Sequence, residues 1–168
     1  MGGKRSKVVF GTVTSKREER KMTVSAHDVV AYILQKQGPM TAMKLQKLLY
    51  YCQAWSLVWD EIPLFEEEIQ AWANGPIVPL IYKDHQGKFR VESWDYGDSS
   101  RLTSTQKKTV DAVLAYYGDK SAQWLSDLTH AEAPWNLARK GLAPGERGNA
   151  IISHASMDEY YSSLLPEQ

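Results

Sequence analysis

The four histidines of this 168-residue chain are the first residues to test for chemistry, because imidazole is both a general base and a common metal ligand near neutral pH. They are scattered, at His27, His85, His130 and His154, and no two have the i, i+4 spacing of an H-E-x-x-H zinc motif. Cys52 is the only cysteine, which excludes zinc sites built from several cysteines. The sequence therefore predicts no metal site and no cofactor.

Other candidate groups for catalysis are weaker still. The Glu-Glu-Glu run at 66–68 offers carboxylates for acid–base work, but adjacent acids on a surface turn are usually solvated. The glycines of the segment 141–149 are not followed by G-K-[ST], so a phosphate-binding loop would lack its lysine. We therefore predict that the protein is not an enzyme. The alternative is a hydrolase or transferase that uses a carboxylate or Cys52, for which His130 would be the base.

The elements that position these groups are organised around the segment 41–59, TAMKLQKLLYYCQAWSLVW. Thr41 is a suitable helix cap, and almost every side chain in the second half of the segment is apolar, which is typical of a helix buried on several sides. We predict that this is the central helix of the fold. Its stripe at the i, i+3, i+4, i+7 intervals consists of Leu45, Leu48, Leu49, Cys52 and Ser56.

The sequence pattern of the rest of the chain indicates a mainly α fold. We predict a compact domain of about six to seven helices around the central buried helix 41–59. We expect the helix that starts at Pro134 to turn Trp135, Leu137 and Ala138 inward. Two partly alternating segments, 68–72 and 88–94, are predicted to pair as a small two-stranded β ribbon. Caps and breakers predict further helices at about 25–38, 77–87, 103–118, 121–129 and 155–165.

The formal net charge of zero hides an uneven distribution. Residues 1–21 carry seven basic and two acidic side chains, a balance of +5, whereas the remainder carries 13 basic and 18 acidic ones, a balance of −5. We expect 1–21 to be a basic, disordered extension and 22–168 to form one domain. An acidic body does not suit a general nucleic-acid binder, so such contact is expected only through 1–21. No apolar run approaches the roughly 18 residues of a membrane span, so we expect a cytoplasmic protein without membrane contact.

The order of elements also fits a winged helix-turn-helix DNA binder, with a helix, a Gly-Pro corner, a second helix and a ribbon. Lys44, Gln46 and Lys47 could reach DNA from the first turns of the second helix. Beyond Lys47, however, that helix is largely aromatic and apolar, whereas a recognition helix presents a polar face to the major groove. A DNA-binding regulator therefore stays open as an alternative.

Three blocks of sequence stand out together: MKLQKLLYYCQAWSL at 43–57, PLFEEEIQAWANGPIVPLIY at 63–82 and LSDLTHAEAPWNLAR at 125–139. In this order and at these separations they resemble the Panacea family, the SocA-like antitoxin domain found in phages, prophages and bacterial chromosomes. The resemblance covers roughly 22–165. Any one block would be a weak signal, but three in the same order make chance similarity improbable.

This resemblance implies a mostly helical fold and a role as the antitoxin of a two-gene toxin–antitoxin pair. Many members of the family neutralise a toxin by binding it directly, including toxins related to alarmone synthetases that modify nucleotides or transfer RNA ends. The SocA-like branch is instead described as a proteolytic adaptor that delivers its toxin to the ClpXP protease. The expected partner is therefore a cognate toxin, and the Clp protease is a further partner under the adaptor alternative.

Polar and aromatic residues within the blocks are the candidates for partner contact, because Trp and Tyr are the anchors that protein interfaces favour. The two candidate tryptophans could equally pack in the core, the lysines could be solvated, and His130 and Glu132 could close a helix end by hydrogen bonding. The candidate partner-binding residues are Lys44, Gln46, Lys47, Trp72, Asn74, Gly75, Pro76, His130, Glu132 and Trp135.

Overall fold

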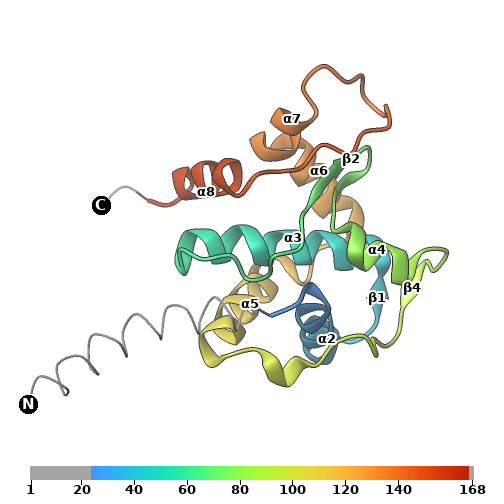
Figure 1. The fold of residues 1–168 in the computed structure, drawn as a ribbon, viewed down its shortest axis with the longest axis vertical. Coiled ribbons are helices and arrows are strands. Elements are labelled where there is room, and N and C mark those ends of the chain that lie inside the picture. The colour runs from blue at the N-terminus through green and yellow to red at the C-terminus, as the bar shows by residue number, and fades with distance from the viewer. Residues whose placement is uncertain (1–23, 167–168) are drawn as a thin grey trace, which may run out of the picture.

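The computed structural model describes residues 24–166, so the prediction of a disordered basic extension at 1–21 lies outside the described residues. Within 24–166 the chain forms seven α-helices, one short 3₁₀ helix and two small antiparallel strand pairs (Figure 1). This confirms the predicted mainly α class. None of the helices in this part of the chain is long and apolar enough to cross a membrane.

The predicted central helix is α3 (Ala42–Trp59), and its side chains form the middle of the core. Thr41 Oγ1 accepts a hydrogen bond from the backbone N–H of Lys44 at 3.2 Å, which confirms the predicted cap. Figure 1 shows α3 between α2 (Ala26–Gln37) and α5 (Ser104–Tyr117) on one side and α7 (Ala133–Ala138) and α8 (His154–Ser163) on the other. The helices that pack directly on α3 are α2, α5, α6 (Ala122–Ala131) and α8.

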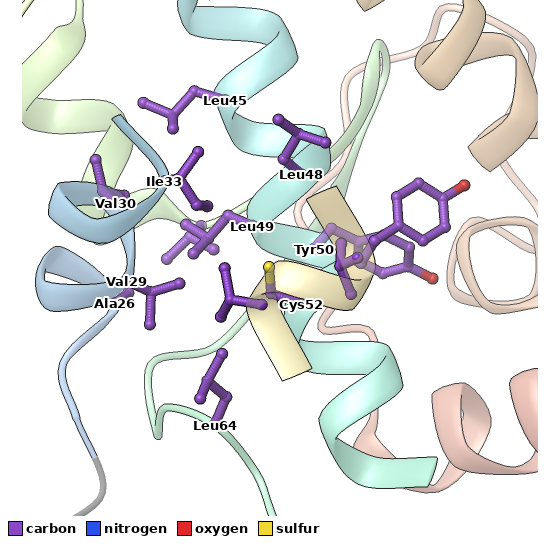
Figure 2. Close-up of a cluster of buried hydrophobic side chains, with 14 of the residues drawn as sticks. Ala26, Val29, Val30, Ile33, Leu45, Leu48, Leu49, Tyr50, Cys52 and Leu64 are labelled. Atoms are coloured by element: carbon purple, nitrogen blue, oxygen red, sulfur yellow. The ribbon is translucent and has the colours of Figure 1, made fainter. Parts of the chain in front are cut away.

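Local sequence signals set the ends of α2 as predicted. Ser25 and Asp28 form a reciprocal capping box at its start, and Gly38 ends it with a φ of 78°. The tight corner that follows folds α3 back against α2. Figure 2 shows the resulting apolar cluster, which includes Ala26, Val29 and Ile33 of α2 and Leu45, Leu49 and Cys52 of α3.

The shorter helices follow the predicted breakers, with one error. Helix α7 has Pro134 in its first turn and buries Trp135, as expected. Leu137 is 62% exposed, so its predicted inward orientation is wrong. Residues two positions apart on a helix point about 200° apart, so burial of Trp135 turns Leu137 outward. The remaining helices are α4 (Pro79–His85), α7 (Ala133–Ala138) and the 3₁₀ helix η1 (Ser99–Arg101).

The predicted pairing of 68–72 with 88–94 is wrong. Strand β2 (Gln70–Trp72) instead pairs with β3 (Gly75–Ile77) as a tight hairpin, and β4 (Arg90–Val91) pairs with β1 (Met40–Thr41), just before α3. A hairpin with a two-residue turn closes locally, whereas the predicted ribbon required closure of a longer loop. Residues that were expected to form one ribbon therefore belong to two separate strand pairs.

Candidate protein-binding site

Two neighbouring side chains of α3 hold the β2–β3 hairpin and the residue that follows it. The first is Gln46, whose Oε1 accepts from the Val78 N–H at 2.8 Å and whose Nε2 donates to the Val78 carbonyl at 3.3 Å. The same Nε2 lies 3.0 Å from His85 Nε2. Gln46 is buried, so its amide fixes the chain from inside the protein.

Lys47 is fully buried although it carries an amine. Its Nζ donates to the Pro76 carbonyl at 3.3 Å and lies 3.0 Å from Met43 Sδ. No carboxylate forms an ion pair with Lys47 within residues 24–166. Burial without a counter-charge disfavours the ammonium form and lowers the pKa of Lys47 to about 7. Lysine is rarely fully buried without an ion pair, so this amine is a costly way to hold a hairpin.

The other side of the hairpin is held by α6, α7 and the residue that follows α7. Three side chains from this region each donate to a hairpin carbonyl, so with Gln46 and Lys47 five side chains bind carbonyls between 71 and 78. A backbone held at so many points is rigid before any partner arrives. The three bonds run from Ser126 Oγ to Asn74 (2.9 Å), from Trp135 Nε1 to Trp72 (2.8 Å) and from Arg139 Nη1 to Ala71 (3.1 Å).

Gly75 is required at the start of β3 by both conformation and space. Its φ of +127° lies in a region that residues with a side chain rarely adopt. A Cβ at this position would overlap Lys47 Cε and would lie 3.0 Å from Lys47 Nζ and 3.3 Å from Thr129 Oγ1. The absence of a side chain therefore allows the buried amine to reach the hairpin.

His130 lies beside the hairpin on α6 and stacks on Trp135, with ring centroids 4.1 Å apart and an interplanar angle of 15°. Its Nε2 is buried and has no hydrogen-bond partner among the described residues. Burial, together with the nearby charge of Lys47, lowers the pKa of His130. The ring therefore presents an unused polar atom next to the hairpin.

Glu132 belongs to a different part of the interior. Its Oε1 accepts from the hydroxyls of Tyr51 at 2.6 Å and Tyr161 at 2.8 Å, and the latter hydroxyl lies 3.0 Å from that of Tyr50. Burial raises the pKa of Glu132, although the two tyrosine hydrogen bonds act in the opposite direction. This carboxyl ties α3 to α8 and does not face the hairpin surface.

Two grooves adjoin the hairpin, with volumes of about 660 and 650 Å³. The first lies between the start of α3, the α4–β4 connection and α6, and the second lies between the hairpin and residues 145–149. Neither groove has an aspartate or glutamate among its lining residues. The residues that line both grooves are Met43, Asn74, Ile77 and Tyr82.

The structure brings all the candidate residues except Lys44 and Glu132 to this hairpin. Lys44 is half-buried on the first turn of α3. Within the hairpin group, Asn74 is exposed and Trp72 and His130 are half-buried, whereas the others face the interior. Direct contact with a partner is thus open to those three side chains, and the buried ones shape the surface from beneath. That they bind a partner stays a prediction.

Sequence reasoning missed several residues of this surface. Ser126 and Arg139 lie within the third sequence block, but nothing in their type or spacing indicates that they donate to hairpin carbonyls. Phe89 lies just before β4, which begins at Arg90, and its side chain is 83% exposed. The sequence signal that could have indicated this exposed position is a single phenylalanine between two charged residues, Lys88 and Arg90.

A family model described as Antitoxin SocA-like, Panacea domain, matches residues 45–136, more than half of the chain. The chain belongs to this family. A curated member, Antitoxin SocA of Caulobacter vibrioides (strain NA1000 / CB15N), is 26% identical over 136 residues, which cover 71% of this chain and 72% of that protein. No solved structure matches the chain.

The region matched by the Panacea family model contains the whole hairpin and most of the side chains that hold it. Gln46, Lys47, Ser126 and Trp135 lie within 45–136, as do both strands. Lys44 precedes the matched region, and Arg139 and Arg147 follow it. The hairpin and its supports are therefore part of the family domain, whereas one wall of the second groove lies beyond the match.

The residues proposed for catalysis have structural roles in this Panacea domain. Cys52 is fully buried, and burial raises the pKa of its thiol, so it is held as a thiol in the core. Glu67, the middle residue of the acidic run, accepts from Ser25 Oγ at 2.9 Å and from the Ala26 N–H at 2.8 Å at the start of α2. Within the described part of the chain no group of three or more His, Cys, Asp or Glu side chains could hold a metal.

The DNA-binding alternative loses two of its three proposed contacts. Gln46 and Lys47 are buried under the hairpin and cannot face a major groove in this conformation. Only Lys44 has some exposure at the start of α3. Moreover, the segments 68–72 and 88–94, which were predicted to pair as the wing, belong to two separate strand pairs. The start of α3 therefore lacks the polar face of a recognition helix.

Proposed function

We propose that this protein is the antitoxin of a two-gene toxin–antitoxin system and that it neutralises its cognate toxin by binding it directly. Membership of the SocA-like, Panacea domain family carries this proposal. The hairpin surface supports it, because a surface already fixed in shape loses little conformational entropy on association. Half-buried Trp72 and exposed Phe89 add the aromatic side chains that interfaces favour.

The test is growth of cells that express the neighbouring gene, alone and together with this one, followed by co-purification of the two products. Direct neutralisation predicts that growth is rescued and that the products form a stable complex. Inhibition should titrate to one antitoxin per toxin. If the toxin is of the alarmone-synthetase type, its modification of nucleotides or transfer RNA ends should stop at that ratio.

The same experiment in cells without the Clp protease separates binding from proteolytic delivery. Direct binding predicts that rescue persists, because occlusion of the toxin needs no degradation. The adaptor mechanism predicts that toxin accumulates and that rescue is lost. Loss of rescue in the protease-deficient strain would thus overturn direct neutralisation, and a harmless neighbouring gene would overturn the antitoxin assignment at that locus.

A further inference from the structure

The two hairpin grooves differ in charge from the rest of the molecule. The chain outside 1–21 has 13 basic and 18 acidic side chains, yet no carboxylate lines either groove. Lys88 lines the first groove and Arg147 the second, and both side chains are exposed. Neither forms an ion pair with any residue between 24 and 166. This surface therefore presents two free positive charges on an otherwise acidic body.

The same surface has an apolar centre. Met43, Ile77 and Tyr82 line both grooves together with Asn74, and we call these three residues the apolar strip. Phe89 stands at the rim of the first groove with 83% of its surface exposed. Leaving an aromatic side chain of this size in water forfeits the favourable burial that an interface would supply.

The backbone that carries Phe89 is fixed, although its side chain is free. The Phe89 carbonyl accepts from the Ala42 N–H at 2.9 Å, and Arg90 next to it pairs with Thr41 in the β1–β4 ladder. The hairpin, which contributes Ile77 to this surface, is held by four side chains, and Gln46 holds Val78 just after it. The backbone under the aromatic rim and the hairpin are therefore held in a set arrangement, which lowers the entropy lost on binding.

We infer that this surface, defined by the two grooves with Lys88, Arg147, Met43, Ile77, Tyr82 and Phe89, binds an acidic segment of the toxin that also carries apolar side chains. The inference rests on the proposed function and names the surface and the chemistry of the partner. Carboxylates of the segment pair with Lys88 and Arg147, and its apolar side chains pack on the strip.

A nucleic acid fits the same surface less well. Its affinity comes mainly from several phosphate contacts, which require a broad basic face. Here only Lys88 and Arg147 carry a full exposed charge in the grooves, and the surrounding body is acidic. A short acidic protein segment needs only the two charges together with apolar packing, and the long-range attraction speeds its encounter.

The experiment measures binding of the purified neighbouring-gene product to the full-length protein and to three variants. The double reversal Lys88→Glu with Arg147→Glu removes the groove charges, and Phe89→Ala removes the rim aromatic. Arg101→Glu with Lys108→Glu is the matched control, because both side chains are exposed, lie outside the grooves and change the net charge equally. Circular dichroism and urea unfolding verify that each variant is folded.

We expect the groove double reversal and Phe89→Ala each to weaken binding by at least about tenfold, with the control within about twofold of the wild type. Wild-type affinity should fall as salt rises, and this dependence should largely disappear in the groove variant. Growth rescue should be lost in parallel. Each of these outcomes supports an acidic partner segment in the grooves.

Other outcomes overturn the inference and separate it from the proposed function. If the wild type binds the toxin and the folded groove variants bind it equally well, the toxin uses another surface and only the inference fails. Equal losses in the groove and control variants would show an effect of net charge alone. A complex that nuclease treatment dissolves would identify nucleic acid as the occupant. If the wild type neither binds the toxin nor rescues growth, the proposed function fails and the inference falls with it.

Discussion

Lys47 Nζ lies 3.3 Å from the carbonyl oxygen of Pro76, and this contact joins the central helix to the hairpin inside the protein. Gly75, the residue before Pro76, leaves the space through which the amine reaches the carbonyl. A buried donor without a counter-charge is costly while it is protonated, so the contact makes the stability of the hairpin depend on pH.

Replacement of Lys47 by methionine should stabilise the protein most at low pH. The pKa of Lys47 is about 7 in the folded protein against an ordinary 10.5. Between these values the unfolded chain binds the proton and the folded protein does not, so wild-type stability rises with pH in this window. Below pH 7 the full cost of burying the charge applies. The Lys47→Met advantage should therefore be largest near pH 6 and decline towards pH 10, measured by urea unfolding at several pH values.

The decline of the Lys47→Met advantage with pH should be large, and an exposed lysine provides its control. A pKa difference from 10.5 to about 7 corresponds to about 5 kcal/mol in all, at about 1.4 kcal/mol per pH unit. Loss of the donor to Pro76 adds a constant cost of about 1–3 kcal/mol at every pH. Lys108→Met, at an exposed position on α5, should show a flat difference. A flat difference for Lys47→Met as well would contradict the burial of an uncompensated charge.

Replacement of Gly75 by alanine should destabilise the protein by about 2–4 kcal/mol, because it adds backbone strain and displaces the Lys47 amine from the Pro76 carbonyl. Gly145→Ala is the matched control. Gly145 has a φ of +79°, but nothing lies within 4 Å of a Cβ placed there, so only the conformational cost of about 1–2 kcal/mol applies. Thermal unfolding of both variants compares the two costs, and equal losses would refute the packing role of Gly75.

Cys52 should be unreactive in the native protein. It is fully buried in α3, and burial raises the pKa of its thiol, so neither access nor thiolate is present for a thiol reagent. Labelling should therefore occur only at the rate of unfolding and should become fast in urea. Cys52→Ala should keep toxin neutralisation, with a modest loss of stability. Rapid labelling of the folded protein would instead restore the hypothesis of a nucleophilic cysteine.

Short-range signals in the sequence predicted the helices well. The caps at Ser25, Thr41 and Thr103 each satisfy backbone N–H groups within three residues, and the stop at Gly38 requires only its own φ. These interactions are local, so residue type and spacing determine them. Strand pairing is not local, and the competition between the 70–77 hairpin and a longer ribbon depended on contacts that no short window contains.

The sequence predicted most residues of the candidate site, but not their burial or their positions relative to one another. Gln46 and Lys47 were expected at a surface, because polar residues near a helix start are usually solvated. They are buried because the hairpin folds over them and offers Val78 and Pro76 as partners, which only tertiary structure provides. The grooves were missed for the same reason, since Lys88 and Arg147, which are distant in sequence, come to line grooves beside the same hairpin only after folding.

Glu132 should reveal its role through two contrasting substitutions. Glu132→Gln keeps an oxygen that accepts from Tyr51 and Tyr161, whereas Glu132→Ala leaves both hydroxyls without this acceptor and should cost about 1–3 kcal/mol per unsatisfied group. The pKa of Glu132 is raised above its ordinary 4.5. The folded protein therefore holds the proton more tightly than the unfolded chain, and this contribution to stability is full below pH 4.5 and is lost as pH rises through the folded pKa.

The neutral glutamine does not lose that contribution, so the stability of Glu132→Gln relative to the wild type should increase as pH rises above 4.5. Glu132→Ala should be the less stable variant throughout. Urea unfolding at pH 5 and pH 8 measures the change. Glu159→Gln, at an exposed position on α8, is the matched control for the loss of one carboxylate. If glutamine and alanine at position 132 were equally destabilising, the tyrosine hydrogen bonds would not be what ties α3 to α8, and apolar packing around Tyr161 would have to account for that contact.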